Sequence, residues 1–198
     1  MVKKYFYLFF FIFLFIGCEQ KMPKNYPNNN TDIIAFGDSL TFGYGAAPTE
    51  SYPAYLSKML DREVINLGVN GDTSAMGLAR IKEIENYSPY MVLVEFSAND
   101  FFRQMPKAQT EKNLRQIVEY LQKLGAIVVL VDTGGVSQMD SYTKIQKRLA
   151  KEYNTLFVPA IMDGIYNKKS LKSDQVHPNG EGYKIVAGKV NKVIKNYL

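Results

Sequence analysis

Short apolar runs alternate along the chain with segments in which apolar residues recur at helical spacing. The short runs have the continuous apolar character of strands that are buried on both faces. They lie at 33–36, 64–67, 91–96, 127–131 and 156–158, and helical spacing is found at 52–60, 75–86, 114–124, 145–153 and 186–194. This alternation predicts an α/β fold, a three-layer α/β/α sandwich around a five-stranded parallel sheet.

The amino-terminal residues do not follow this pattern. Lys3 and Lys4 precede an almost unbroken apolar run at 5–17. A membrane-spanning helix needs about 20 apolar residues, whereas a shorter run suits a secretory signal. Residues 14–18, Leu-Phe-Ile-Gly-Cys, resemble a bacterial lipobox, in which the cysteine is acylated and becomes the mature amino terminus; Phe15 departs from the usual leucine.

We therefore expect three parts: a signal peptide at 1–17, a lipidated Cys18 with a flexible tether at 18–31, and one domain at 32–198. A plain signal peptide and an uncleaved anchor are the alternatives, and all three would export the domain. The expected location is the bacterial envelope, on the periplasmic side of the outer membrane or at the cell surface. The membrane would then be a partner through the lipid anchor.

The amino-acid composition excludes or disfavours several classes of function. The formal net charge is +5, and without Lys3 and Lys4 it falls to about +3, which is too small to indicate nucleic-acid binding. Cys18 is the only cysteine, so an intramolecular disulfide cannot form. His177 is the only histidine, which disfavours a histidine-dependent metal site. No metal or other cofactor is expected, and the oligomeric state stays open.

Polar segments follow each expected strand, at the edge where parallel sheets bind their ligands. They are 37–39, 68–74, 97–100, 132–135 and 174–177. None has the lysine of a phosphate loop, the three glycines of a dinucleotide-binding turn or the Gly-x-Ser-x-Gly pattern of an α/β-hydrolase elbow.

Nucleophilic catalysis fits these segments better. Ser39 follows the first strand and is the candidate nucleophile, with His177 as its base and Asp174 as the group that orients the imidazole. The Gly71 N–H and the Asn99 amide are candidate oxyanion donors. Taken singly, Gly71 is better explained by a tight turn and Asn99 by a strand-end cap.

Four blocks of the chain together resemble the SGNH or GDSL hydrolases. The blocks are Gly-Asp-Ser-Leu at 37–40, Gly-Val-Asn-Gly-Asp at 68–72, Ser-Ala-Asn-Asp at 97–100 and Asp-Gln-Val-His-Pro at 174–178. The resemblance implies a cofactor-free serine hydrolase with the Ser39, His177 and Asp174 roles above. It implies an oxyanion hole made by Ser39, Gly71 and Asn99. It is closest to the small bacterial lysophospholipase, arylesterase and acyl thioesterase branch, which usually has two glycines where this chain has Ser97 and Ala98.

The expected function is a serine esterase that cleaves small-molecule acyl esters, with lysophospholipids or other lipid esters leading and thioesters included. One alternative is an O-acetyl esterase of cell-wall or surface polysaccharide. Another, from a different class, is a non-catalytic envelope lipoprotein on a hydrolase fold. Tyr44, Phe101, Phe102 and Met105 lie near the blocks and are candidates for an acyl pocket, or are ordinary core and rim residues.

Overall fold

A sheet of five parallel strands forms the centre of the computed structural model, which describes residues 22–198. The strand order is β2-β1-β3-β4-β5, so β1 lies between β2 and β3. At the carboxyl end of β1, Gly37 pairs with Gly68 on β2 and with Glu95 on β3. The strands are β1 Asp32–Gly37, β2 Val64–Gly68, β3 Pro89–Glu95, β4 Ile127–Val131 and β5 Leu156–Val158.

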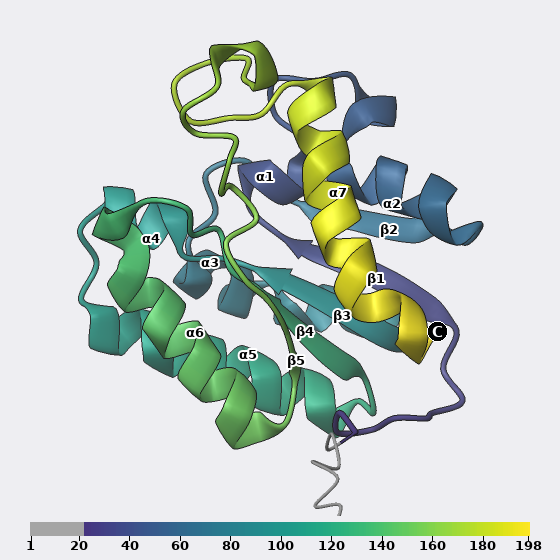
Figure 1. The fold of residues 1–198 in the computed structure, drawn as a ribbon. Helices are drawn as coiled ribbons and strands as arrows, with labels where there is room; N and C mark the ends of the chain where they lie inside the picture. Colours follow the sequence, from purple (N-terminus) through teal and green to yellow (C-terminus); the bar gives the residue numbers. More distant parts are fainter. Residues whose placement is uncertain (1–21) are drawn as a thin grey trace, which may run out of the picture.

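Helices cover both faces of this sheet (Figure 1). Side chains alternate along β1, so that Ile33 and Ala35 join one core and Ile34 and Phe36 join the other. The first core is covered by α2 Tyr52–Leu60 and α7 Gly180–Ile194, and the second by α3 Ser74–Ala79, α5 Lys107–Lys123 and α6 Asp140–Tyr153. Two short helices, α1 Ser39–Phe42 and α4 Ala98–Phe102, follow β1 and β3. The predicted three-layer α/β/α sandwich is confirmed.

One expected helix is interrupted. The pattern at 75–86 predicts a single helix, but α3 ends at Ala79 and a 3₁₀ turn follows at Ile81–Asn86. Arg80 lies between them, with φ −103° and ψ 11°, and its side chain extends to the ends of β1 and β2. Apolar spacing continues through both parts, and for that reason the break is not visible in the pattern.

The segment predicted as a tether packs on the domain from residue 22 onward. Asparagine side chains bond to backbone carbonyls beside the amino ends of the strands: Asn25 donates to Gln122 and Ala126, both at 2.9 Å, and Asn30 donates to Pro89 at 3.1 Å. The polar composition of this segment therefore reflects hydrogen bonding to the domain. The predicted signal peptide and Cys18 lie outside the described residues. Among residues 22–198, no helix combines the length and apolar character needed to cross a bilayer.

Ser97, between β3 and α4, has a backbone conformation that favours glycine. Its φ is +138°, and the residue is fully buried. Gln146 Nε2 donates to its hydroxyl at 3.2 Å, which helps to hold it. The departure from glycine noted at this position therefore introduces backbone strain.

We expect Ser97→Gly to stabilise the protein by about 1 kcal/mol, because glycine relieves the positive φ at the loss of one side-chain hydrogen bond. Urea denaturation followed by circular dichroism measures the change. Ala98→Gly is the matched control, since Ala98 begins α4, where glycine lowers stability. Equal destabilisation by both substitutions would contradict the assignment of strain to Ser97.

Candidate active site

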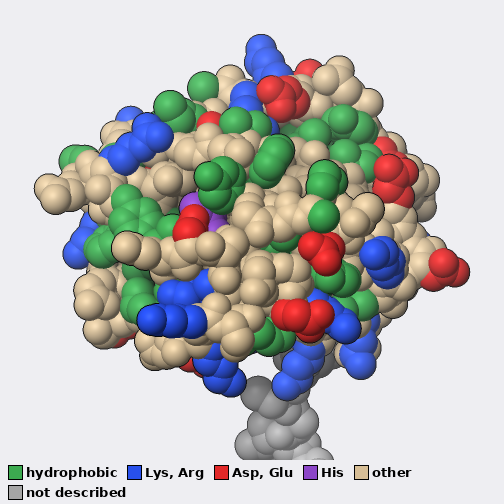
Figure 2. Space-filling view, turned by 90° about the horizontal axis from the view of Figure 1, so that it is seen from above, with side chains coloured by type: hydrophobic (Ala, Val, Ile, Leu, Met, Phe, Trp, Pro, Cys, Tyr) green, Lys and Arg blue, Asp and Glu red, His purple; other side chains and the backbone are tan. Residues whose placement is uncertain are grey.

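The carboxyl ends of β1, β2 and β3 bring three of the four sequence blocks together. Ser39 is the first residue of α1, directly beyond β1. The turn into α1 is tight: a Cβ at Gly37 would lie 2.1 Å from Thr41 Oγ1 and 2.6 Å from the Glu95 carbonyl oxygen. Glycine at 37 is thus needed for α1 to pack closely on the end of the sheet. Figure 2 views the molecule from above, with the imidazole of His177 partly visible between apolar side chains and a carboxylate.

Ser39, His177 and Asp174 form a continuous hydrogen-bonded chain. Ser39 Oγ lies 3.0 Å from His177 Nε2, and His177 Nδ1 lies 2.7 Å from Asp174 Oδ2. The loop before α7 supplies the last two residues, and the Ser173 N–H donates to the His177 carbonyl at 3.0 Å to close it. The geometry is that of a nucleophile, a base and an orienting carboxylate.

Asp174 is held as a carboxylate by its own turn. The backbone N–H groups of His177 and Val176 donate to its Oδ1 at 2.7 and 2.8 Å. Burial raises the pKa of Asp174, but these two donors and the imidazole outweigh it and lower the pKa to about 2. Asp174 is therefore ionised throughout the neutral range and can keep the Nδ1 proton on His177.

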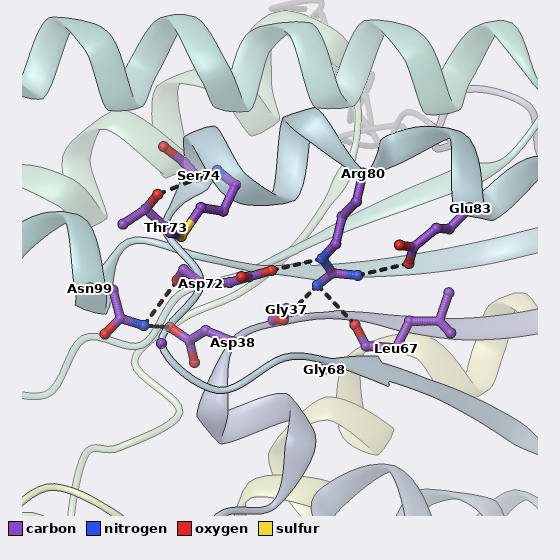
Figure 3. Close-up of polar contacts among 12 residues, drawn as sticks. Gly37, Asp38, Leu67, Gly68, Asp72, Thr73, Ser74, Arg80, Glu83 and Asn99 are labelled. Carbon is purple, nitrogen blue, oxygen red and sulfur yellow. Dashed lines mark hydrogen bonds and ion pairs between the residues drawn. The ribbon is translucent and has the colours of Figure 1, made fainter.

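The two other predicted donors follow neighbouring strands, Asn99 after β3 and Gly71 after β2. Asn99, on α4, donates from Nδ2 to Asp38 Oδ2 at 3.0 Å and to the Asp72 carbonyl at 2.9 Å (Figure 3). Gly71 precedes Asp72 and has φ +80°, a conformation that favours glycine. Both hydrogens of the Asn99 amide are engaged in this state. An incoming oxyanion must replace one of these two bonds.

A buried pair of carboxyl groups lies next to the candidate nucleophile, Ser39, and was not identified from the sequence. Asp38 accepts the Leu40 N–H at 2.9 Å at the start of α1, and its carboxyl hydrogen-bonds to that of Glu95. Glu95 also accepts from Thr133 Oγ1 at 2.9 Å and from Thr41 Oγ1 at 3.2 Å. Glu95 is the only charged residue in the apolar run at 91–96, and this is the sequence feature that could have identified it.

Asp38 and Glu95 are both fully buried. Burial raises the pKa of each carboxyl, and the charge of Glu95 raises the pKa of Asp38 further. Two buried carboxyl groups in hydrogen-bonding contact cannot both ionise easily, so the pair retains a proton. The shared proton allows a direct hydrogen bond between them.

A cavity of about 90 Å³ opens beside Ser39 and His177. Phe102 lines it but is 54% exposed, and the Tyr44 ring lies 4.6 Å from the His177 ring, centroid to centroid. Of the four aromatic and methionine candidates, only Phe102 lines this cavity, and Phe101 contacts both Phe102 and Tyr142. The remaining lining residues are Leu40, Ala98, Asn99, Thr133, Tyr166 and Val176.

Residues 35–185 match the model of the GDSL-like Lipase/Acylhydrolase family, and this span contains all the residues of the site. The chain belongs to this family. Its sequence is 31% identical over 164 residues to thioesterase 1/protease 1/lysophospholipase L1 of Escherichia coli strain K12, covering 78% of this chain and 79% of that protein. It is 28% identical over 178 residues to the arylesterase of Vibrio mimicus, covering 84% and 89%.

The fold agrees with that of solved members of the GDSL family. The crystal structure of TesA superimposes with a TM-score of 0.79 at 25% identity, over 85% of this chain and 100% of that chain. The family match, these relatives and the hydrogen-bonded site make the chain an esterase of the serine hydrolase type. The alternative of a non-catalytic lipoprotein on this fold is set aside.

The buried carboxyl pair predicts a pH dependence of stability. Because the folded pKa values of Asp38 and Glu95 are raised, the folded state keeps protons that the unfolded chain loses near pH 4. Stability must then fall as the pH rises through the raised pKa values. Glu95→Gln removes one titrating group, so we expect its free energy of unfolding to decline less between pH 5 and 9.

Urea denaturation at each pH measures this slope. The exposed Glu63→Gln is the matched control and is expected to keep the wild-type slope. Identical slopes for Glu95→Gln and the wild type would show that Glu95 does not share a proton in the folded state.

Proposed function

We propose that Ser39 is the nucleophile of an acyl-ester hydrolase that works through an acyl-serine intermediate. The observation that carries this proposal is the hydrogen-bonded chain from Ser39 through His177 to Asp174. Ser39 Oγ attacks the ester carbonyl while His177 Nε2 takes its proton. The proton then passes to the leaving alcohol as the C–O bond breaks, and water, activated by the same imidazole, releases the acid.

The oxyanion is received by the N–H groups of Ser39 and Gly71 and by the amide of Asn99. As charge develops on the carbonyl oxygen, Asn99 Nδ2 exchanges one of its hydrogen bonds, to Asp38 or to the Asp72 carbonyl, for a hydrogen bond to the substrate oxygen. The shared proton of Asp38 and Glu95 favours this exchange, because it makes the Asp38 carboxyl a weaker acceptor than a free carboxylate.

Lipid esters, including lysophospholipids, are the leading substrates, and thioesters fit the same acyl-serine chemistry. The name of the Escherichia coli relative includes both thioesterase and lysophospholipase activity. Tyr44 and Phe102 flank the site and are 47% and 54% exposed, so they offer an apolar surface to an acyl chain. A long chain would lie across this surface, outside the cavity.

Removal of acetyl groups from polysaccharide is the second candidate, and the size of the cavity favours it. Its volume of about 90 Å³ is well below the roughly 300 Å³ at which pockets for drug-sized ligands begin. A fully enclosed acyl group must therefore be short. Ala98 lines this cavity at a position where the resembled branch usually has glycine.

The protein is further proposed to be exported and anchored through a lipidated Cys18. Lys3, Lys4 and the apolar run at 5–17 support export. Lys24 and Asn25 bond to the domain at the edge opposite the site, so the chain joins the anchor at that edge. The site would then face away from the membrane that holds the anchor, towards periplasmic or external substrates.

Replacing the nucleophile tests the proposed reaction. We expect Ser39→Ala to lower kcat for p-nitrophenyl acetate by at least about 10⁴-fold, because no other group can form the acyl intermediate. Ser137→Ala is the matched control, an exposed serine that follows two glycines after β4. Hydrolysis by Ser39→Ala at near the wild-type rate would rule out Ser39 as the nucleophile.

A chain-length series separates the two substrate classes. With p-nitrophenyl esters from acetate to decanoate, we expect kcat/KM to rise beyond acetate, and Phe102→Ala to lower kcat/KM for decanoate about tenfold while sparing acetate. Phe42→Ala is the matched control, since Phe42 is 50% exposed but lies outside the cavity. A sharp preference for acetate would instead favour the polysaccharide substrate.

A further inference from the structure

Arg80 connects the ends of two strands from a nearly buried position. Its side chain is only 14% exposed. Nη2 donates to the carbonyl oxygen of Gly37 at 3.1 Å and to that of Leu67 at 3.0 Å, near the carboxyl ends of β1 and β2 (Figure 3). The guanidinium carbon lies 4.3 Å from the centre of the Phe36 ring. These contacts fix the planar group on the sheet edge.

The same guanidinium holds the loop that carries Gly71. Nε donates to Asp72 Oδ2 at 2.7 Å, and the Asp72 side chain is only 10% exposed. A charge-assisted bond of this length between two largely buried groups is strong and directional. Without Arg80, the largely buried Asp72 carboxylate would lose its ion-pair partner. The loop would then rearrange to expose this charge to water.

Asp72 in turn stands between the two predicted oxyanion donors. It directly follows Gly71 in the chain, and its carbonyl accepts the Asn99 amide at 2.9 Å. Movement of Asp72 would therefore displace the Gly71 N–H and the Asn99 amide together. Gly37, the other carbonyl partner of Arg80, is two residues before Ser39. Arg80 thus contacts both sides of the site without reaching the reacting atoms.

We propose that Arg80 is a positioning residue of the oxyanion hole, which holds the loop at 68–72 against the end of β1 so that Gly71 and Asn99 stay in place beside Ser39. A planar fork is needed for this role, because one guanidinium bonds to two carbonyls and to two carboxylates, those of Asp72 and the exposed Glu83, in different directions. The single ammonium of lysine keeps the charge but cannot reproduce that pattern.

Arg80→Lys tests the inference, with p-nitrophenyl acetate as the substrate. We expect kcat to fall about 10- to 100-fold and KM to change by less than about threefold, because displaced donors bind the transition state less well than the ground state. Arg62→Lys is the matched control: Arg62 also bonds to a backbone carbonyl, that of Thr31, and lies over the Tyr90 ring, at the opposite edge of the sheet. We expect Arg62→Lys to leave kcat unchanged.

A double variant distinguishes positioning from a general structural role. If Arg80 acts through the oxyanion hole, Arg80→Lys combined with Asn99→Ala should lose less kcat than the product of the two single losses, because Asn99→Ala already removes one of the two donors that Arg80 positions. Losses that multiply would overturn the inference, as would a folded Arg80→Lys with kcat within about twofold of the wild type.

If Arg80→Lys shows no cooperative thermal transition, Asp72→Asn takes its place. We expect the same loss of kcat, and a folded Asp72→Asn with kcat within about twofold of the wild type would overturn the inference. The inference rests on the proposed function, so it is judged on the activity that Ser39→Ala removes. A loss in Ser39→Ala together with unchanged kcat in the Arg80 and Asp72 variants would overturn the role of Arg80 alone. Retained activity in Ser39→Ala would overturn the proposed function and, with it, the role of Arg80.

Discussion

The pairing of β1 with β2 on one side and β3 on the other determines where the site can form. Parallel pairing aligns the carboxyl ends of the three strands, with Gly37 opposite both Gly68 and Glu95. The segments that follow these strands must then leave the sheet side by side. Although these segments are far apart in sequence, this register brings Asn99 within hydrogen-bonding reach of Asp38, which precedes Ser39, and of Asp72, which follows Gly71.

The carboxyl end of the sheet also provides different environments for two carboxyl groups near Ser39, the proposed nucleophile. Asp38 is enclosed beside Glu95, and burial raises its pKa. Asp174 lies on a partly exposed turn, where backbone N–H donors lower its pKa to about 2. Neighbouring groups with pKa values moved in opposite directions are typical of catalytic sites. Here burial favours the protonated form of the Asp38 and Glu95 pair, and hydrogen-bond donors favour the charged form of Asp174 beside the imidazole.

Local patterns predicted the elements well where packing follows periodicity. The strands at 127–131 and 156–158 and the helix at 52–60 have the expected bounds. The pattern failed where polar side chains bond to distant backbone. Arg80 interrupts the helix expected at 75–86 through contacts with strand ends, and Asn25 attaches the expected tether through carbonyls about a hundred residues away. Periodicity contains no information on such bonds.

Residue types and their order were enough to indicate the fold class and to make Ser39, Asp174 and His177 candidates for a nucleophile, an acid and a base. The resemblance of four blocks to the SGNH hydrolases is what singled them out. The roles of Arg80 and Glu95, and the size of the cavity, could be seen only in the folded protein. Each depends on distances between side chains and backbone groups from separate elements. Those distances are set by strand register and by packing, which sequence spacing does not record.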